Sequence, residues 1–265
     1  MTDAFDRLGY GTYKLAAGEE CAAGVAHAIE TGYRHVDTAQ GYDNEASVGD
    51  GIDRSDVDRE ELFVATKLST DNLSYDDAVE TARASRDRLG VDSIDLLYVH
   101  WPIDSYDPEE TLPALDDLVD DGVIDRIGLS NFEPDQLDEA IDRLDREVFA
   151  HQVECHPLLQ QERLREYAVE DGHWLVAYSP IARNRVADVD VHEAGEGDGE
   201  HVAEHLEDLV GHPRNRGGIV ATAADRRADR VPAEVGPGHH LQPLLLADHR
   251  GHLLVELGGD VLRER

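Results

Sequence analysis

The sequence predicts an α/β fold of the (β/α)8 barrel type, and three observations support that prediction. Short apolar runs alternate with helical stretches of roughly 15 to 20 residues, the βαβα rhythm that is typical of a parallel sheet. A polar side chain follows almost every apolar run, and chemistry in such barrels collects at the carboxyl ends of the strands. The chain has 265 residues, and a single barrel domain takes about 250.

Seven apolar runs are predicted to be strands, all of them before residue 180. They cover residues 8–14, 34–37, 62–67, 94–99, 127–129, 151–154 and 174–179. Asp37 ends the second run, Lys67 ends the third, and His100 follows the fourth. An aspartate, a lysine and a histidine that arrive from consecutive strands form a candidate catalytic site, which indicates an enzyme.

About six helices are expected by residue 180, and five can be placed by their spacing and end signals. In the first, Cys21, Val25 and Ile29 share one face, and Gly32 follows its end. Ser74 is a candidate N-cap of the second helix, because a serine oxygen accepts from the free N–H groups of a first turn. The five helices are predicted at residues 17–31, 74–89, 108–121, 134–146 and 160–171.

The composition indicates a strongly acidic surface. Asp and Glu number 58 against 24 Lys and Arg, so the net charge is −34. Lys14 and Lys67 are the only lysines. Nucleic acids and anionic membranes bind basic surfaces, so neither is expected as a partner. We interpret the acidity as adaptation of a halophile to high salt, where screening weakens self-repulsion.

We expect a protein of the cytoplasm. The N-terminus lacks the basic segment and the apolar stretch of a signal peptide. No apolar run approaches the roughly 18 residues of a membrane span. Cys21 and Cys155 are the only cysteines, and we expect two unrelated buried thiols rather than a disulfide, as in a reducing compartment.

Four motifs over residues 5–190 resemble those of the aldo-keto reductase family and follow one another in that family's order. They are Gly32–Gly49 with Asp37-Thr-Ala-Gln-Gly-Tyr42, Val99–Pro102, the stretch from Leu118 to Phe132 with Gly128-Leu-Ser-Asn, and Gln152–Pro157. The resemblance implies a (β/α)8 barrel that reduces aldehydes and ketones to alcohols with NADPH, NADH not being excluded. It also implies a small carbonyl substrate and a monomer.

The resemblance implies roles for four residues. Tyr42 would donate a proton to the nascent alkoxide. A free tyrosine has a pKa of about 10 and is a weak acid at neutral pH, so the ammonium of Lys67 would stabilise its phenolate. Asp37 would hold Lys67, and His100 would donate a hydrogen bond that orients the carbonyl. Taken without the resemblance, Asp37 and Lys67 could equally be an ordinary ion pair.

The resemblance also implies which residues surround the cofactor and the substrate. Ser130, Asn131 and Gln152 would bind the nicotinamide carboxamide, and Tyr178 would stack on the ring. Gly11, Thr12 and Asp37 would line the ribose, Ser179 and Ile181 would lie near the pyrophosphate, and Tyr13, Trp101 and His100 would form the substrate pocket. No metal is expected. Core packing is the alternative for Tyr178 and Trp101, and we interpret His35 and His156 as structural.

The pattern changes after residue 190. All fifteen aromatic residues (4 Phe, 2 Trp and 9 Tyr) lie at or before Tyr178, and no lysine follows Lys67. The family's eighth strand and the helix that grips the adenosine end of the cofactor have no recognisable counterpart. We therefore divide the chain into a barrel domain at residues 1–190 and an atypical tail at 191–265. A helix at 200–210 and a strand at 251–257 are the elements suggested within the tail.

Two explanations of the tail remain open. A reading-frame shift near residue 191 would leave a segment never selected to fold, an open barrel and a catalytically impaired remnant. Alternatively, residues 218–223 form an atypical eighth strand. We favour the first, which predicts that residues 192–265 lack a dense core and contribute little to the cofactor cleft. A weaker alternative makes the histidine-rich tail a metal-binding module around His201 and His205.

Overall fold

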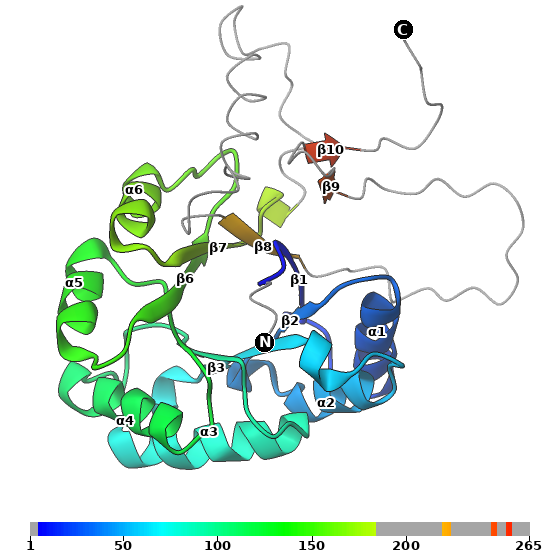
Figure 1. Ribbon diagram of the computed structural model, residues 1–265, viewed down its shortest axis with the longest axis horizontal. Helices are drawn as coiled ribbons and strands as arrows, with labels where there is room; N and C mark the ends of the chain where they lie inside the picture. The colour runs from blue at the N-terminus through cyan, green and yellow to red at the C-terminus, as the bar shows by residue number, and fades with distance from the viewer. Residues whose placement is uncertain (1–4, 184–218, 224–244, 248–252, 256–265) are drawn as a thin grey trace, which may run out of the picture.

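Eight strands form a closed parallel barrel in the computed structural model, which describes residues 5–183, 219–223, 245–247 and 253–255 (Figure 1). The barrel strands are β1 (Leu8–Gly11), β2 (His35–Asp37), β3 (Phe63–Leu68), β4 (Leu96–Val99), β5 (Ile127–Ser130), β6 (Val148–Glu154), β7 (Trp174–Tyr178) and β8 (Ile219–Ala223). Each strand pairs in parallel with the next, and β8 pairs with both β7 and β1. The predicted barrel class is therefore confirmed.

The described part of the chain has six α-helices, which form an arc around the strands (Figure 1). They are α1 (Glu19–Glu30), α2 (Glu45–Asp53), α3 (Tyr75–Leu89), α4 (Pro108–Asp120), α5 (Pro134–Arg143) and α6 (Glu162–Asp171). Three short 3-10 helices accompany them, η1 (Gln40–Tyr42), η2 (Arg59–Glu61) and η3 (Thr70–Asn72). Five of the α-helices were predicted, and α2 is the sixth that the sequence did not place.

The ends of α3 show how local chemistry sets a helix boundary. Gly90 follows its last residue with φ of 67°, a left-handed conformation that glycine adopts without steric cost. Ser74 stands at the N-cap position, but its hydroxyl donates to the Asp77 carboxylate at 2.6 Å and makes no capping bond. The predicted position of the cap is confirmed, and the predicted capping bond is wrong.

The eighth strand corrects one consequence of our preferred interpretation of the tail, the open barrel. We expected an open barrel, but the backbone of β8 pairs with β1 and with β7 in parallel register, Leu8 opposite Ala221 and Leu175 opposite Ile219. The backbone shows a strand at 219–223, within the segment 218–223 of the second explanation. Pairing on both sides removes two unpaired sheet edges, which would otherwise be exposed.

The rest of the tail contains one further described pair of strands. β9 (Leu245–Ala247) and β10 (Leu253–Val255) pair in antiparallel fashion, and β10 lies within the suggested strand at 251–257. The possible helix at 200–210 and most of the segment from 192 onward lie outside the described residues. The predicted lack of a core there stays a prediction.

Buried side chains fill the interior of the barrel beneath the polar residues of its carboxyl-terminal end. Ala65, Tyr98, Ala150 and Val176 belong to one buried cluster, and each stands two residues before a polar residue in the carboxyl-terminal part of its strand or directly after it. Because side chains alternate along a strand, these four share the interior of the barrel with the polar residues above them. The ring of Tyr98 packs on Gly128, where an added Cβ would lie 2.4 Å from the Tyr98 ring. Glycine at this position is therefore a requirement of the packing.

Both cysteines are free and buried, as predicted. Burial raises the pKa of the Cys21 thiol and of the Cys155 thiol to about 11, so both are protonated and unreactive at neutral pH. Within the described residues, none of the helices combines the length and the apolar character needed to cross a bilayer.

Candidate active site

A buried ion pair between Asp37 and Lys67 forms the centre of the site. Asp37 ends β2 and lies opposite Ala65 of β3, two residues before Lys67. Lys67 Nζ donates to Asp37 Oδ1 at 2.6 Å and to the Thr38 carbonyl at 2.7 Å. The two residues are 4% and 1% exposed. Burial lowers the pKa of Lys67, but Asp37 and Tyr42 raise it by more, so the net pKa lies above its ordinary value and the ammonium keeps its charge.

Tyr42 lies at the end of η1, beside this pair. Lys67 Nζ is 5.2 Å from the centroid of the Tyr42 ring. Burial raises the pKa of Tyr42, the Lys67 ammonium lowers it, and Asp37 raises it again, which leaves the net pKa above the ordinary value of 10.0. The lysine therefore acts in the predicted direction, but desolvation outweighs it. Tyr42 carries its proton at neutral pH.

His100 follows β4, and its ring faces that of Tyr42. The ring centroids are 5.8 Å apart and the planes meet at 77°. Burial, assisted by the Lys67 charge, lowers the pKa of His100 to about 4. The imidazole is therefore neutral at pH 7 and can donate a hydrogen bond without carrying a positive charge. The structure thus brings Asp37, Tyr42, Lys67 and His100 together at the carboxyl ends of β2 to β4.

Polar side chains at the ends of β5 and β6 continue the site. Gln152 Nε2 donates to Asp37 Oδ2 at 2.9 Å, which connects β6 to the ion pair. Ser130 Oγ donates to the Gln152 carbonyl at 2.9 Å. The Asn131 amide donates to the His100 carbonyl at 2.9 Å. Ser130, Asn131 and Gln152 therefore form one hydrogen-bonded group next to the ion pair.

Tyr178 and the turn after it form the next part of the mouth. The Tyr178 hydroxyl donates to Asn131 Oδ1 at 3.1 Å, and the residue is only half-buried, so core packing does not account for its ring. Ser179 has φ of 52°, and its carbonyl accepts from the Ala182 N–H at 2.7 Å, which closes a tight turn. Ile181 in this turn is 41% exposed.

The end of β1 forms the side of the mouth next to β2. Gly11 lies opposite Asp37, and the Thr12 N–H donates to the Asp37 carbonyl at 2.9 Å. The Thr12 hydroxyl is fully buried and has no hydrogen-bond partner among the described residues. A buried hydroxyl normally has a partner, so a polar group of a bound molecule fits here. The residues present therefore suit a sugar hydroxyl at the position where the resemblance places the nicotinamide ribose.

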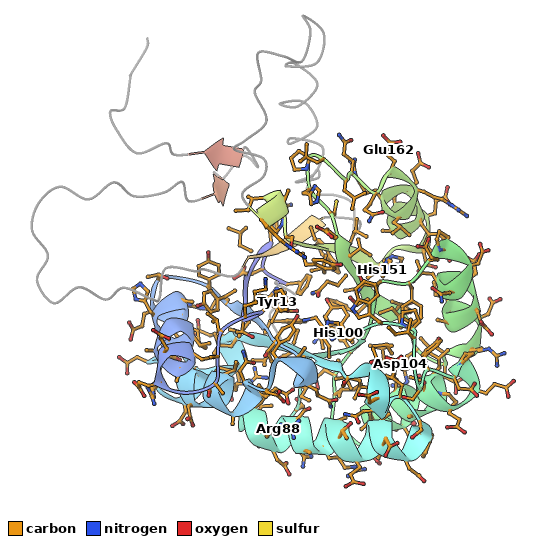
Figure 2. The ribbon with its side chains drawn as sticks, turned by 180° about the vertical axis from the view of Figure 1, so that it is seen from behind. Tyr13, Arg88, His100, Asp104, His151 and Glu162 are labelled. Carbon is orange, nitrogen blue, oxygen red and sulfur yellow. The ribbon has the colours of Figure 1, made fainter. Side chains whose placement is uncertain are left out.

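Two aromatic side chains lie at the rim. Tyr13 is 49% exposed and Trp101 is 41% exposed, so neither is a core residue. The Tyr13 ring lies 5.3 Å from that of Tyr42, centroid to centroid. Figure 2 shows Tyr13 and His100 toward the middle of the molecule, whereas Arg88 lies on the outer helices. The rim thus offers apolar surface next to the polar centre.

The two histidines interpreted as structural are buried. His35 is 0% exposed and packs against the rings of Phe5 and Phe63, at centroid distances of 4.9 and 5.3 Å. Burial lowers the pKa of His35 to about 4. His156 Nδ1 accepts from the Leu158 N–H at 3.2 Å. Among the described residues, no group of three or more His, Cys, Asp and Glu side chains could hold a metal ion, and His201 and His205 lie outside them.

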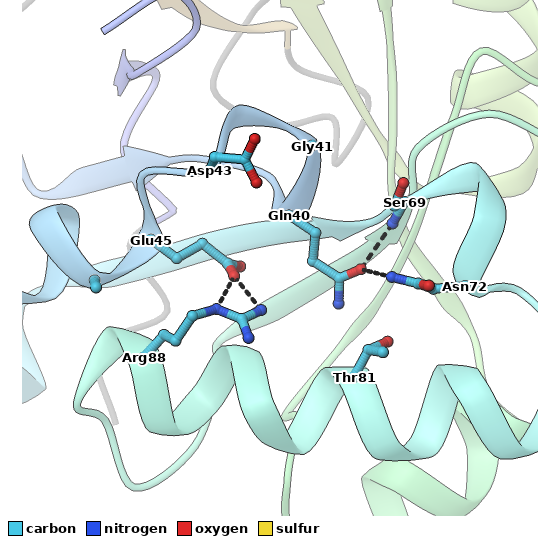
Figure 3. Close-up of a pocket in the computed structure, with 9 residues that line it drawn as sticks. Gln40, Gly41, Asp43, Glu45, Ser69, Asn72, Thr81 and Arg88 are labelled. Atoms are coloured by element: carbon cyan, nitrogen blue, oxygen red, sulfur yellow. Dashed lines mark hydrogen bonds and ion pairs between the residues drawn. The ribbon is translucent and has the colours of Figure 1, made fainter. Parts of the chain in front are cut away.

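Sequence reasoning missed a polar network beside Tyr42. Gln40 and Glu45 are 9% and 2% exposed although both are polar. They line a cavity of about 420 Å³ that also includes Ser69 and Arg88 and none of the four central residues of the site (Figure 3). The available signal was their position, two residues before and three residues after Tyr42, within a motif rich in polar residues, of which Thr38 and Asn44 are also buried.

The chain belongs to the aldo/keto reductase family. The profile described as "Aldo/keto reductase family" matches residues 7–246, which reaches well past residue 190, where the recognisable motifs end. The match includes the eighth strand of the barrel.

Curated relatives and solved structures agree with this assignment. The chain is similar to glyoxal reductase of Bacillus subtilis, with 39% identity over 185 residues, 69% of this chain and 66% of the relative. It is similar to 9,11-endoperoxide prostaglandin H2 reductase of Trypanosoma cruzi, with 39% identity over 69% of this chain and 64% of the relative. The chain thus spans slightly less than two thirds of the length of these relatives. A crystal structure of a putative 2,5-diketo-D-gluconic acid reductase B shares the fold with TM-score 0.72 and 32% identity, over 84% of this chain and 79% of the other.

Proposed function

We propose that this chain is an NADPH-dependent reductase of aldehydes and ketones, with Tyr42 as the proton donor. The observation that carries the proposal is the buried Asp37–Lys67 pair, whose ammonium lies 5.2 Å from the Tyr42 ring centroid. A purely structural ion pair would not require a tyrosine and a neutral histidine beside it at the open end of a barrel. The names of the relatives, reductases of carbonyl and peroxide compounds, support the same class of reaction.

The described residues account for the proton side of this reaction. A bound nicotinamide supplies the hydride. His100, neutral at pH 7, donates a hydrogen bond to the carbonyl oxygen and orients it. Tyr42 gives its proton to the same oxygen as negative charge develops there, and the Lys67 ammonium stabilises the phenolate that remains. Asp37 holds the ammonium in place through the 2.6 Å contact.

The cofactor would be held by residues on both sides of the mouth. Asn131, Ser130 and Gln152 would bind the carboxamide, and Tyr178 would stack on the nicotinamide. The unpartnered hydroxyl of Thr12, with Gly11, would meet the ribose, and Ser179 and Ile181 would lie near the pyrophosphate. The preference for NADPH over NADH rests on the family, because residues that would contact a 2′-phosphate have no counterpart among the described side chains.

The substrate would be a small carbonyl compound placed between His100 and the exposed rings of Tyr13 and Trp101. All four central side chains come from one chain, which is consistent with a monomer. The net charge of −34 makes the compact state dependent on screening, so we propose a halophilic protein whose activity is measured in concentrated salt.

Tyr42→Phe tests the proposal. It removes the acid and keeps the ring, so turnover of simple aldehydes should fall about 100-fold or more while dinucleotide affinity by fluorescence titration stays unchanged. Tyr75→Phe is the matched control, because Tyr75 is a partly exposed tyrosine on α3. A Tyr42→Phe variant that keeps about a tenth of wild-type turnover would remove Tyr42 from this role.

The wild-type chain itself separates the proposed enzyme from an impaired remnant. Micromolar NADPH binding with turnover supports the enzyme. A folded chain that binds neither NADPH nor NADH would instead support the remnant.

A further inference from the structure

Gln40 ties η1 to the end of β3. It stands two positions before Tyr42 and is buried. Its Oε1 accepts from the Ser69 N–H at 2.9 Å and from Asn72 Nδ2 at 3.0 Å, and Ser69 stands two positions after Lys67. Because a backbone N–H can only donate, the orientation of the Gln40 amide is determined.

Glu45 makes the matching connection on the other side of Lys67. It opens α2, three positions after Tyr42, and is buried. Its Oε1 accepts from the Thr66 hydroxyl at 2.6 Å, and Thr66 immediately precedes Lys67. Arg88 of α3 neutralises the carboxylate through a contact of 2.6 Å from Nη2 to Oε2. The segment with the tyrosine is therefore tied to the strand with the lysine on both sides.

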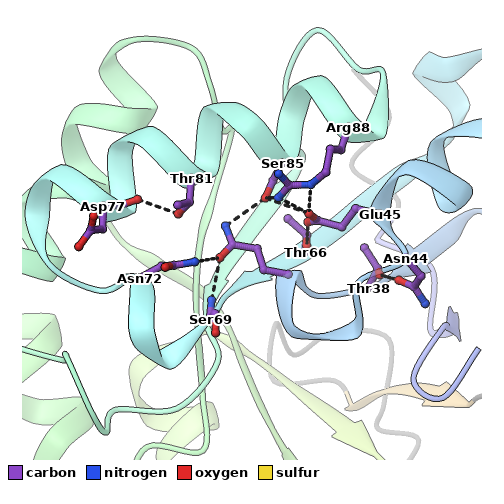
Figure 4. Close-up of polar contacts among 11 residues, drawn as sticks. Thr38, Asn44, Glu45, Thr66, Ser69, Asn72, Asp77, Thr81, Ser85 and Arg88 are labelled. Carbon is purple, nitrogen blue, oxygen red and sulfur yellow. Dashed lines mark hydrogen bonds and ion pairs between the residues drawn. The ribbon is translucent and has the colours of Figure 1, made fainter. Parts of the chain in front are cut away.

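Ser85 of α3 joins the two connections (Figure 4). Its hydroxyl donates to Glu45 Oε2 at 3.2 Å and accepts from Gln40 Nε2 at 3.1 Å and from Arg88 Nη2 at 3.0 Å. A hydroxyl has one proton to donate and two acceptor sites, so its capacity is fully used. A buried network with every member satisfied is rigid and specifies one arrangement.

We propose that Gln40 and Glu45 are positioning residues that fix the Tyr42 phenol relative to the Lys67 ammonium. This inference rests on the proposed function and adds to it the means by which proton donor and lysine are kept together. The hydrogen bonds of the Asp37 carboxylate go to Lys67 and Gln152 rather than to the segment that carries Tyr42. Ahead of η1, the Thr38 N–H ties the chain to β3 by donating to the Ala65 carbonyl at 2.9 Å. The backbone bonds of η1 itself, from Tyr42 N–H to the Ala39 carbonyl and from Asp43 N–H to the Gln40 carbonyl, are both 3.1 Å long and stay within the turn. Gln40 and Glu45 therefore supply the side-chain ties from this segment to β3.

The network can be tested through the pKa of Tyr42, because Glu45 does not itself shift that pKa. Besides burial, the groups that shift the pKa of Tyr42 are Lys67, Asp37 and Tyr13, and Glu45 is not one of them. The His100 ring packs against that of Tyr42, and Tyr42 in turn raises the pKa of Tyr178. Breaking the network therefore changes the pKa of Tyr42 through displacement from Lys67. Because Lys67 lowers that pKa, a displacement that leaves Tyr42 equally buried raises it.

Gln40→Leu tests the proposal, since it removes three hydrogen bonds and keeps the size of the side chain. A displacement of about 1 Å can cost about 100-fold in rate, so kcat should fall about tenfold to 100-fold while KM for NADPH changes less than about twofold. Tyr42 should titrate at higher pH in the variant. Glu45→Gln, which keeps one acceptor for Thr66, should shift both quantities in the same direction by less.

Asp95→Asn is the control for a general loss of stability. Asp95 Oδ2 accepts from the Val64 N–H at 2.8 Å and from Arg59 at 2.6 Å, at the opposite end of β3. The variant removes the charge that Arg59 contacts and leaves one oxygen to accept from Val64, so it weakens a tie on the same strand without touching η1. It should lower Tm as Gln40→Leu does and leave kcat and the titration of Tyr42 unchanged.

NMR titration of ring-labelled tyrosines, assigned with Tyr42→Phe, gives the pKa of Tyr42 without turnover. An inactive wild-type chain would refute the proposed function, and the titration would still decide the positioning role. A Gln40→Leu variant with unchanged kcat and unchanged titration would overturn the proposal. An Asp95→Asn variant that shifts both as much as Gln40→Leu would overturn it as well.

Discussion

One added methyl group at residue 128 should disturb two strands that carry the site. A Cβ on Gly128 would lie 2.4 and 2.6 Å from Cδ1 and Cε1 of Tyr98, well inside the contact distance of about 3.5–4.0 Å between carbons. The two residues are opposite each other in β5 and β4, and Tyr98 is fully buried, so its ring has no room to turn away. Overpacking of this kind costs about 1–3 kcal/mol. Gly128→Ala should lose that much free energy of unfolding.

The effect should also reach the mouth of the barrel. Ser130 and Asn131 follow Gly128 in the chain, and His100 follows Tyr98, so separation of β4 from β5 moves the group expected to bind the carboxamide. Urea unfolding gives the stability, and fluorescence titration gives the NADPH affinity, which should weaken in Gly128→Ala. Tyr98→Leu removes the ring. In the double variant, the loss of stability should be at least about 1 kcal/mol smaller than the sum of the two single losses.

Gly49→Ala is the matched control for this cycle. A Cβ there would lie 2.7 Å from the Leu89 carbonyl oxygen, which is backbone and cannot be relieved by a side-chain change. Tyr98→Leu should therefore leave the cost of Gly49→Ala unaltered. Additive losses for Gly128→Ala and Tyr98→Leu would refute the reasoning that the tyrosine ring imposes glycine at residue 128.

Three further predictions concern charge. Burial lowers the pKa of His35 to about 4. Between pH 6.5 and pH 4 the unfolded chain therefore binds a proton at this residue and the native protein does not. The contribution of neutral His35 to the free energy of unfolding is complete above pH 6.5 and declines toward pH 4. His35→Leu should make the fall in unfolding free energy smaller by about 1.4 kcal/mol per pH unit in this range. Urea midpoints that fall with decreasing pH as steeply as in the wild type would contradict this. Asp37→Asn leaves the buried Lys67 ammonium without its counter-ion and should cost about 3–5 kcal/mol of unfolding free energy; a cost near zero in urea would show that the pair is not needed for folding. Since the pKa of His100 is about 4 and that of Tyr42 lies above 10.0, reduction rates should be level between about pH 6 and 8, and a step near pH 6.5 would show that His100 titrates there.

The sequence predicted six of seven strand ends to within one residue, because two independent signals coincide there. The exception is β1, which was predicted to reach residue 14 and ends at Gly11. An apolar run that stops at a polar residue marks both the end of β3 and the position of Lys67. Parallel strands bring their carboxyl ends to one edge, so Asp37 and Lys67 could be expected together. Their hydrogen bonds follow from that placement. The shift in the pKa of Tyr42 could not be predicted, because the sequence identifies the neighbouring lysine and says nothing of how much water burial removes.

Helix α2 was missed because its residues contradict ordinary helix preferences. It contains Gly49 and Gly51, and glycine is among the poorest helix formers. A Cβ on Gly51 would lie 2.6 Å from the Ala22 carbonyl oxygen, so close packing against α1 requires glycine there. Packing against α1 therefore determines the glycines of this helix, and local helix propensity alone does not predict the helix.

The eighth strand could be predicted only weakly from its own residues, because its formation depends on closure of the whole barrel. Residues 219–223 form a short run with little pattern, which the sequence could present only as an alternative. Once seven strands curl, β1 and β7 leave two unpaired edges, and pairing with a further strand stabilises both. The parallel register sets Thr222 opposite Tyr178 and Ala223 opposite Tyr10. The carboxyl end of β8 therefore lies at the same edge as Tyr178 and Gly11, so the strand that closes the barrel also completes the mouth in which the proposed reaction takes place.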